Sequence, residues 1–265
     1  MPSPEPSNPT PRPTRRTVNS VVQAAAILRH LGGLGEGAGV NAVARATGIG
    51  PSSCFNVLRT LVAEDLAAFD PVSKRYTLGM GTIDLARRAL GSDALVRAAQ
   101  APMASLALSH DAAIGLWRLS QTRLVLVGLA ESPAATRIHM QIGQRQPASA
   151  GAVGRAVLAA GDHSDQSIIA AYAKARWHTP PGEAAFLAEV REATARGYAL
   201  DRGHSIHGLA TLACPIQEPQ GAVRFILSAS LFDGRESPAG LDAIGRALIE
   251  TARTLTQTVQ GREQP

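Results

Sequence analysis

The spacing of apolar residues in the first third of the chain predicts three helices. One is expected over 18–31, a short second one over about 41–47 and a third over 51–64. Gly48 supplies the small residue that a tight turn between the second and third helices needs. Pro51 suits the first turn of the third helix, because the amide that proline lacks has no partner at that position.

A β-hairpin and a further helix are predicted directly after these three helices. Short β-like runs at 67–69 and 74–78 flank a turn signal that contains Pro71. Three helices followed by a hairpin are typical of a winged helix-turn-helix. A helix over 80–90 is expected to link this domain to the rest of the chain.

Beyond residue 93 the pattern changes to helices and strands in mixed order, which predicts an α+β domain. Strands are expected at 114–119, 123–131, 137–142, 209–216 and 223–231. A Gly- and Ala-rich loop (147–154) leads into a helix that ends near 160, and further helices are expected at 95–109, 165–175, 183–196 and 238–259. The predicted organisation is a disordered Pro-rich tail (1–16), a winged domain (17–79), a linker helix (80–91) and a second domain (92–265).

The composition indicates a protein that buries a core and does not enter a membrane. Of 265 residues, 45% are hydrophobic and 18% are charged. No apolar run approaches the ~18 residues of a membrane helix. Residues 1–16 contain no apolar segment of a secretory signal, so a cytoplasmic protein without membrane partners is expected. Cys54 and Cys214 lie far apart in sequence, which predicts neither a disulfide framework nor a zinc finger.

The positive charge gathers in the first third of the chain. The net charge is +5, and residues 1–90 carry ten basic against six acidic side chains. A polyanion is therefore a natural partner of this region. The alternative is that the charge serves solubility alone.

The free face of the third helix carries groups that can read DNA. Ser52 and Ser53 lie at a helix N-terminus, where phosphates bind well. Asn56 can pair with adenine, and Arg59 with guanine or phosphate. The candidate DNA-contacting residues, with those of the second helix and the hairpin tip, are Arg45, Ser52, Ser53, Asn56, Arg59, Lys74 and Arg75. The alternative is an ordinary amphipathic helix with a solvated polar face.

These residues resemble the winged domain of IclR-type bacterial transcriptional regulators. The matching segments are 44–49, 51–53, 58–61 and 75–79, and the resemblance continues at 142–147, 151–159, 197–201, 208–216 and 223–230. The chain departs from the family at Asn56, where Arg is frequent, and at Asp65, where Gly is frequent. The resemblance implies an α+β protein with an N-terminal winged helix-turn-helix, a linker helix and a C-terminal GAF-like α/β effector-binding domain. It also implies dimers through the winged domains and tetramers through the effector domains.

The resemblance places a small-molecule pocket on one face of the C-terminal sheet. The implied effector-contacting residues are Ala148, Gly151, Asp201, Leu209, Thr211, Ser228 and Ser230. Alternation along the strands agrees, since Leu209 and Thr211 share one strand face, as do Ser228 and Ser230. The hydroxyls on these strands, opposite the Gly-rich backbone of 150–154, suit a carboxylate ligand. The alternative is that they bind no ligand and form a polar cross-strand pair, with Asp201 as a capping residue.

Two features of the sequence bear on the effector class. An Asp at 201 repels a carboxylate unless it is protonated or pairs a hydroxyl. Ser149 stands where many family pockets carry His. Trp117 and Leu119 either line the pocket or pack in the core. The expected effector is a small organic acid, an aromatic acid or a related amide.

An enzyme, in particular a small-molecule hydrolase, is the alternative from another class. Ser205, His204, His207 and Asp201 are present, but no Gly-x-Ser-x-Gly elbow accompanies them. The His204-x-x-His207 pair lacks the further ligands of a metal site. Catalytic, metal and cofactor sites are therefore not expected. Both cysteines are expected to pack in the core, with a redox switch as a lesser alternative. A pure protein-interaction module is a further lesser alternative. The prediction is a repressor of a catabolic operon that binds operator DNA as a homodimer or homotetramer.

Overall fold

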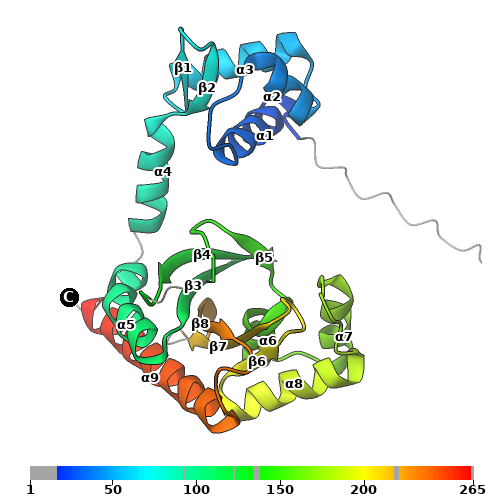
Figure 1. Ribbon diagram of the computed structural model, residues 1–265, viewed down its shortest axis with the longest axis vertical. Helices are drawn as coiled ribbons and strands as arrows, with labels where there is room; N and C mark the ends of the chain where they lie inside the picture. The colour runs from blue at the N-terminus through cyan, green and yellow to red at the C-terminus, as the bar shows by residue number, and fades with distance from the viewer. Residues whose placement is uncertain (1–16, 92–93, 122, 134–137, 218–220, 264–265) are drawn as a thin grey trace, which may run out of the picture. The chain divides into compact units, whose positions relative to one another are not determined.

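The computed structural model describes residues 17–91, 94–121, 123–133, 138–217 and 221–263. The chain divides into two compact units, one up to Ala89 and one from Leu90 onward (Figure 1). The tail predicted over 1–16 lies outside the described residues. Within them, no helix is long and apolar enough to cross a membrane. The predicted α+β fold with an N-terminal helix-turn-helix is confirmed.

The N-terminal unit is a three-helix bundle followed by a hairpin and one more helix. Its elements are α1 (Asn19–Gly32), α2 (Val40–Thr47), α3 (Pro51–Ala63), β1 (Ala67–Asp70), β2 (Arg75–Leu78) and α4 (Met80–Gly91). One apolar stripe of each of the first three helices meets in a single core, because burial of these side chains is what stabilises short helices. The core residues are Ile27, Leu31, Val43, Ala44, Ile49, Cys54, Leu58, Leu61, Ala67 and Tyr76.

Backbone geometry fixes the turns of this unit. Gly48 ends α2 with a left-handed φ of 69°, as a helix C-terminus favours, and Pro51 opens α3. Asp65 adopts a φ of 55°, a conformation that Asp tolerates better than most residues. Its carbonyl oxygen accepts a hydrogen bond from the Gly81 amide at 2.9 Å. A Cβ on Gly79 would lie 2.2 Å from the same oxygen, so only glycine fits where the hairpin meets α4.

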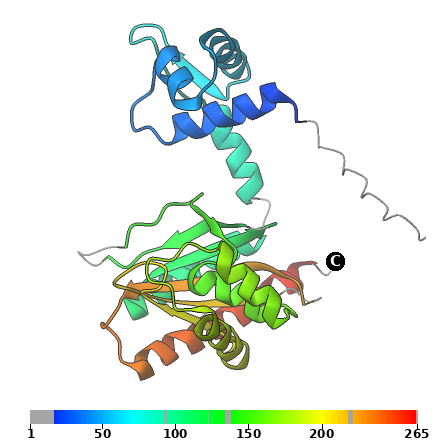
Figure 2. The ribbon, with the colours of Figure 1, turned by 90° about the vertical axis from the view of Figure 1, so that its right-hand side faces the viewer.

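The C-terminal unit is an antiparallel sheet with helices on both faces (Figure 2). Its helices are α5 (Ala94–His110), α6 (Gly151–Ala160), α7 (Asp165–Lys174), α8 (Glu183–Arg196) and α9 (Pro238–Glu263). Its strands are β3 (Ala113–Ser120), β4 (Arg123–Ala130), β5 (Arg145–Pro147), β6 (Ala199–Arg202), β7 (Leu209–Gln217) and β8 (Val223–Phe232). The strand order is β5-β4-β3-β8-β7-β6. Helices α5 and α9 cover one face, and α6 lies on the other with α8 and α7 behind it.

Strand alternation divides the side chains of β7 and β8 between two cores. Leu212 and Leu227 belong to the core under α5 and α9. Ala213 and Ile226 belong to the core beneath α6. Towards the end of β8 the second face becomes polar, with Ser228 and Ser230. The sheet therefore presents hydroxyl groups next to the N-terminus of α6.

The strand predicted over 137–142 is wrong. Residue 137 lies outside the described residues, and 138–142 form no strand. The short strand β5 lies a few residues later and pairs with β4, in a stretch for which no strand was predicted. The misleading alternation has a physical cause, because Ile138 and Met140 line a cavity while Ile142 points to solvent. Strand β6 was not predicted, and α6 begins at Gly151, inside the expected loop.

Both cysteines are buried, and we expect neither to react in the native protein. Cys54 and Cys214 are free thiols. Burial raises the pKa of Cys214 to about 12 and also raises that of Cys54. Because the thiolate is the nucleophile, an aromatic disulfide reagent at mildly alkaline pH is expected to release no chromophore from the folded protein. In guanidinium both thiols are expected to react, and rapid labelling of the native protein would revive a redox role.

Candidate functional site

The first candidate site is the exposed face of α3. Its buried side is formed by Cys54, Leu58 and Leu61. Ser52, Ser53, Asn56 and Arg59 all lie on the exposed side of the helix. Within the described residues the side chains of Asn56 and Arg59 make no hydrogen bond or ion pair, so both are available to an external partner. The structure therefore places these candidates together on one accessible helix face.

The remaining DNA-contact candidates lie on α2 and on the hairpin. Arg45 is exposed on α2, and Lys74 is exposed at the hairpin tip with a φ of 56°. Arg75 differs from them, because its Nη1 donates to Glu36 Oε2 and to the Gly37 carbonyl oxygen, both at 3.1 Å. A contact from Arg75 to DNA would have to compete with that ion pair.

The hairpin tip is held by an acidic side chain. The Asp70 carboxylate accepts hydrogen bonds from the amides of Val72 at 2.9 Å and Ser73 at 3.3 Å. A further bond from the Ser73 hydroxyl lowers the pKa of Asp70, with smaller help from Lys74. The tip therefore carries one acidic and one basic charge side by side, and it is less basic than the sequence alone indicates.

The second candidate site is a cavity of about 350 Å³ between the sheet and the N-terminal end of α6. This volume lies within the range of small-molecule sites. The lining residues are Trp117, Ile138, His139, Met140, Gln144, Gln146, Gly151, Ala152, Val153, Asp201, Ser205, Ile206, His207, Leu209, Thr211, Ser228, Ser230 and Phe232. Every predicted effector residue lines this cavity except Ala148, which packs against the core beneath α6.

The two serines of β8 have different environments. Thr211 Oγ1 and Ser230 Oγ lie 3.1 Å apart as a cross-strand pair. Ser228 Oγ accepts a hydrogen bond from Trp117 Nε1 at 2.9 Å and lies 3.4 Å from the Gly115 carbonyl oxygen. Trp117 is thus both a cavity wall and a core residue, and Ser228 fixes its ring. Thr211 and Ser230 are the hydroxyls that remain to meet a ligand.

The N-terminus of α6 adds backbone donors to the same cavity. Gly151, Ala152 and Val153 line it, and the cap residue Ala150 offers no side-chain acceptor. The first amides of a helix have no acceptor within the helix, and they carry the positive end of its dipole. This end of the cavity is therefore suited to an anionic group.

Asp201 lies in the cavity wall, but its acceptor capacity is already used. Its Oδ2 accepts from Arg155 Nη1 at 2.7 Å and from Ser205 Oγ at 3.0 Å. Its Oδ1 accepts from the amides of His204 at 3.1 Å and Ser205 at 3.2 Å. A carboxylate has about four acceptor positions. Asp201 therefore holds the loop that follows it, and it shares the positive charge of Arg155 with Glu189.

Arg155 is the functional residue that sequence reasoning missed. Its side chain is fully buried, and it also pairs with Glu189 at 2.6 Å. Its guanidinium carbon lies 5.2 Å from the Trp177 ring centre and 5.0 Å from that of Phe186. One signal was visible, namely a lone basic residue within the otherwise apolar segment 151–160. Its partners lie too far along the chain to be read from local spacing.

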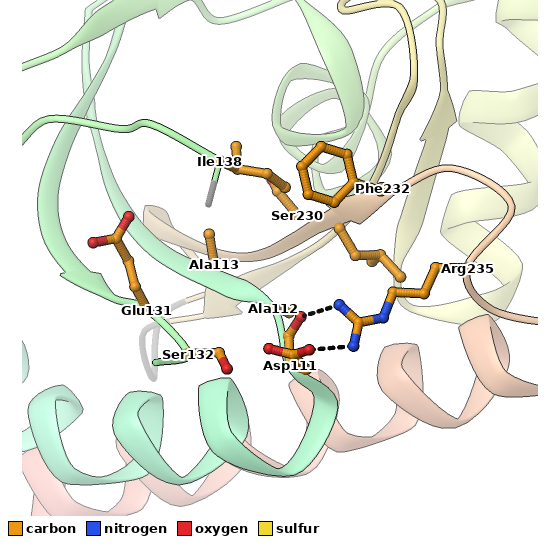
Figure 3. A pocket seen from close by; sticks show the side chains of 10 residues that line it. Asp111, Ala112, Ala113, Glu131, Ser132, Ile138, Ser230, Phe232 and Arg235 are labelled. Atoms are coloured by element: carbon orange, nitrogen blue, oxygen red, sulfur yellow. Dashed lines mark hydrogen bonds and ion pairs between the residues drawn. The ribbon is translucent and has the colours of Figure 1, made fainter. Parts of the chain in front are cut away.

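A small recess adjoins the cavity at the end of the sheet (Figure 3). Ile138, Ser230 and Phe232 line both spaces. On the far side Arg235 forms an ion pair with Asp111, and hydrogen bonds from Ser132 and Arg235 lower the pKa of Asp111. The recess is about 20 Å³, which is room for about one water molecule.

The histidines near the cavity form no metal centre with the described residues. His207 lies 5.5 Å from His178, ring centre to ring centre. Among the described residues no group of three or more His, Cys, Asp or Glu side chains is placed to hold a metal ion. His207 lines the cavity, whereas His204 contacts Arg155, with its Nδ1 3.3 Å from Nη2.

A helix-turn-helix unit with a free polar face, joined in one chain to an α/β unit with a ligand-sized cavity, defines a class of DNA-binding transcriptional regulators. Comparison with known families agrees. The family model "Bacterial transcriptional regulator IclR C-terminal" matches residues 87–257, and "IclR helix-turn-helix domain" matches residues 20–71. The chain belongs to the IclR family of bacterial transcriptional regulators, and it is not an enzyme.

Individual relatives support this assignment over most of the chain. The chain is 30% identical to the glycerol operon regulatory protein of Streptomyces coelicolor over 213 residues, 78% of this chain and 84% of that protein. It is 25% identical to the regulator KdgR of Escherichia coli over 252 residues, 94% and 95% of the two chains. The crystal structure of an IclR transcriptional regulator from Alicyclobacillus acidocaldarius superimposes with a TM-score of 0.79 at 27% identity, covering 91% and 99%.

Proposed function

We propose that this regulator is a cytoplasmic repressor of a catabolic operon. A small organic or aromatic acid either releases it from operator DNA or keeps it bound there. The domain within 17–79 binds operator DNA, the helix over 80–91 links the two domains, and the domain within 92–265 binds the effector. The protein acts as a homodimer or homotetramer. The supporting observation is the cavity in which the α6 amides face the hydroxyls of Thr211 and Ser230. The glycerol operon relative is by its name the regulator of an operon.

The two ends of the cavity fit the two parts of such an effector. The amides of Gly151, Ala152 and Val153 suit a carboxylate. The rings of Trp117 and Phe232 supply apolar walls for a carbon skeleton. Asp201 opposes an acid less than a free carboxylate does, because it shares the Arg155 cation with Glu189 and its oxygens already accept other hydrogen bonds. This reduces the conflict that the sequence raised between an acidic residue and an acidic ligand.

The proposed operator contacts are Arg45, Ser52, Ser53, Asn56, Arg59, Lys74 and Arg75. The effector acts by binding one arrangement of the protein more tightly than the other, since a ligand can shift an equilibrium only by that difference in affinity. The decisive test measures binding to the DNA upstream of its own gene at two salt concentrations, with and without a library of small organic acids. Failure to bind specifically at low salt would contradict the proposal.

Removing the paired hydroxyls of Thr211 and Ser230 from the cavity is expected to weaken the effector response. The variant carries Thr211→Val with Ser230→Ala. Two lost neutral hydrogen bonds weaken effector binding by about tenfold to a hundredfold. The measurement is calorimetric titration with the compound that alters DNA binding, together with DNA affinity in its absence, which is expected to stay unchanged.

The matched control is Thr256→Val, whose hydroxyl bonds the Gln217 carbonyl oxygen at 3.0 Å, away from the cavity. It is expected to bind the effector normally. Equal losses in both variants would indicate a general packing defect and remove the two hydroxyls from the effector site.

A further inference from the structure

An apolar side chain lies within the polar face of α3. Phe55 is 47% exposed and is absent from the core cluster of its unit. It is three positions after Ser52 and four before Arg59, so the three side chains form one stripe along the helix. The other side chains on this face, Ser52, Ser53, Asn56 and Arg59, are polar. Among the described residues this ring makes no aromatic or cation–π contact, and about half of its surface faces solvent.

The chemistry of the major groove limits what this ring can contact. If Ser52, Asn56 and Arg59 face base edges, Phe55 enters the groove with them. The groove displays hydrogen-bond donors and acceptors at every base pair, and its one apolar group is the C5 methyl of thymine. A phenyl ring gains by covering a methyl group, whereas it leaves a polar base edge desolvated without a partner.

A second copy of the chain is a poorer partner for this surface. Residues 51–63 contain Arg59 and no acidic side chain. An interface made by two such faces would bring two arginines together without a compensating carboxylate from the helix. DNA supplies both the negative charge for Arg59 and the methyl group for Phe55.

We infer that Phe55 reads thymine methyl groups in the operator and thereby selects thymine at one position of each half-site. This inference rests on the proposed operator contacts of α3. It adds a specificity residue whose contribution is apolar and independent of salt, next to the hydrogen bonds of Asn56 and Arg59. Uracil pairs with adenine as thymine does but lacks the methyl group. Replacing one thymine by uracil therefore tests the contact with that single methyl group.

The experiment starts with selection of bound sequences from a random duplex library. In the selected operator each thymine is then replaced singly by deoxyuridine, and the dissociation constant is measured at one salt concentration. The native protein is expected to lose about fourfold in affinity at one thymine of each half-site, the value of one buried methyl group. Phe55→Ala is expected to bind the thymine and uracil duplexes equally.

The matched control is Phe69→Ala, a similarly exposed phenylalanine on β1 whose ring contacts that of Tyr76 in a tilted arrangement, 4.7 Å between ring centres. It is expected to keep the uracil sensitivity. If Phe55→Ala folds poorly, Phe55→Gln serves, with unfolding followed by circular dichroism. The inference is overturned if the native protein binds every uracil-substituted duplex as tightly as the thymine duplex. It is also overturned if the Phe55 variants remain sensitive to uracil, or if their oligomeric state differs from that of the native protein. Failure to select any sequence overturns the proposed function instead.

Discussion

Replacing Arg155 with methionine is expected to lower the unfolding free energy of the C-terminal unit by about 3–5 kcal/mol. The guanidinium is fully buried and pairs with Asp201 and Glu189 at 2.7 and 2.6 Å. Methionine fills much of the volume but leaves two carboxylates without their cation, one of which is only 4% exposed. The cost arises from these uncompensated charges rather than from lost packing.

Urea unfolding followed by tryptophan fluorescence measures this effect in the relevant unit alone, because the chain has two tryptophans and both Trp117 and Trp177 lie there. The matched control is Arg191→Met on α8, whose ion pair with Asp165 is exposed on both sides. It is expected to change the unfolding free energy by less than about 1 kcal/mol. Adding Asp201→Asn and Glu189→Gln to Arg155→Met is expected to restore part of the loss. Equal effects of the Arg155 and Arg191 variants would show that the buried network does not stabilise the unit.

The double change Asn56→Ala with Arg59→Ala is expected to weaken operator binding by at least about thirtyfold. Each bidentate contact to a base contributes about 1–3 kcal/mol of discrimination. Both side chains are exposed and unpaired within the described residues, so their loss leaves the fold intact. Competition assays with the selected operator and with unrelated DNA separate lost specificity from lost affinity.

The salt dependence identifies the role of Arg59 separately. If Arg59 contacts a phosphate, Arg59→Ala lowers the slope of log affinity against log salt by about 0.9. An unchanged slope would assign Arg59 to a base. Arg75→Ala is the control, because Glu36 already pairs with that guanidinium, and its effect on affinity is expected to be smaller. Unaltered operator binding by the double variant would instead favour a protein-interaction role for the N-terminal unit.

The sequence predicted the N-terminal unit well because its signals are local. The apolar stripe through Cys54, Leu58 and Leu61, the turn at Gly48 and the position of Pro51 each act within a few residues. The structure confirms each of them. The strand over 137–142 failed for the opposite reason, because alternation arises from any extended segment with one side towards an apolar space, whether or not its backbone pairs with a neighbour.

The cavity was predictable in outline but not in its chemistry. Alternation on β7 and β8 placed Thr211, Ser228 and Ser230 on one face, yet it gave no sign that Ser228 is bound to Trp117 across the sheet. Arg155 contacts Glu189 and Asp201, which lie 34 and 46 residues further along the chain. Contacts of this kind depend on the tertiary arrangement, so they leave no periodic trace in the sequence.

The filled hydrogen-bonding shell of Asp201 bears on how this protein could be turned into a biosensor. A designer seeking a new analyte would ordinarily randomise the acidic residue first, since it is the charged group of the cavity wall. Here that choice would remove the hydrogen bonds that hold the loop beyond β6 and would take one of the two carboxylate partners from the buried Arg155. Substitutions at Met140, Leu209 and Phe232 change the shape of the cavity and leave the ion pairs of Arg155 in place. Libraries built on that division are expected to yield more folded, DNA-competent variants than libraries built on Asp201.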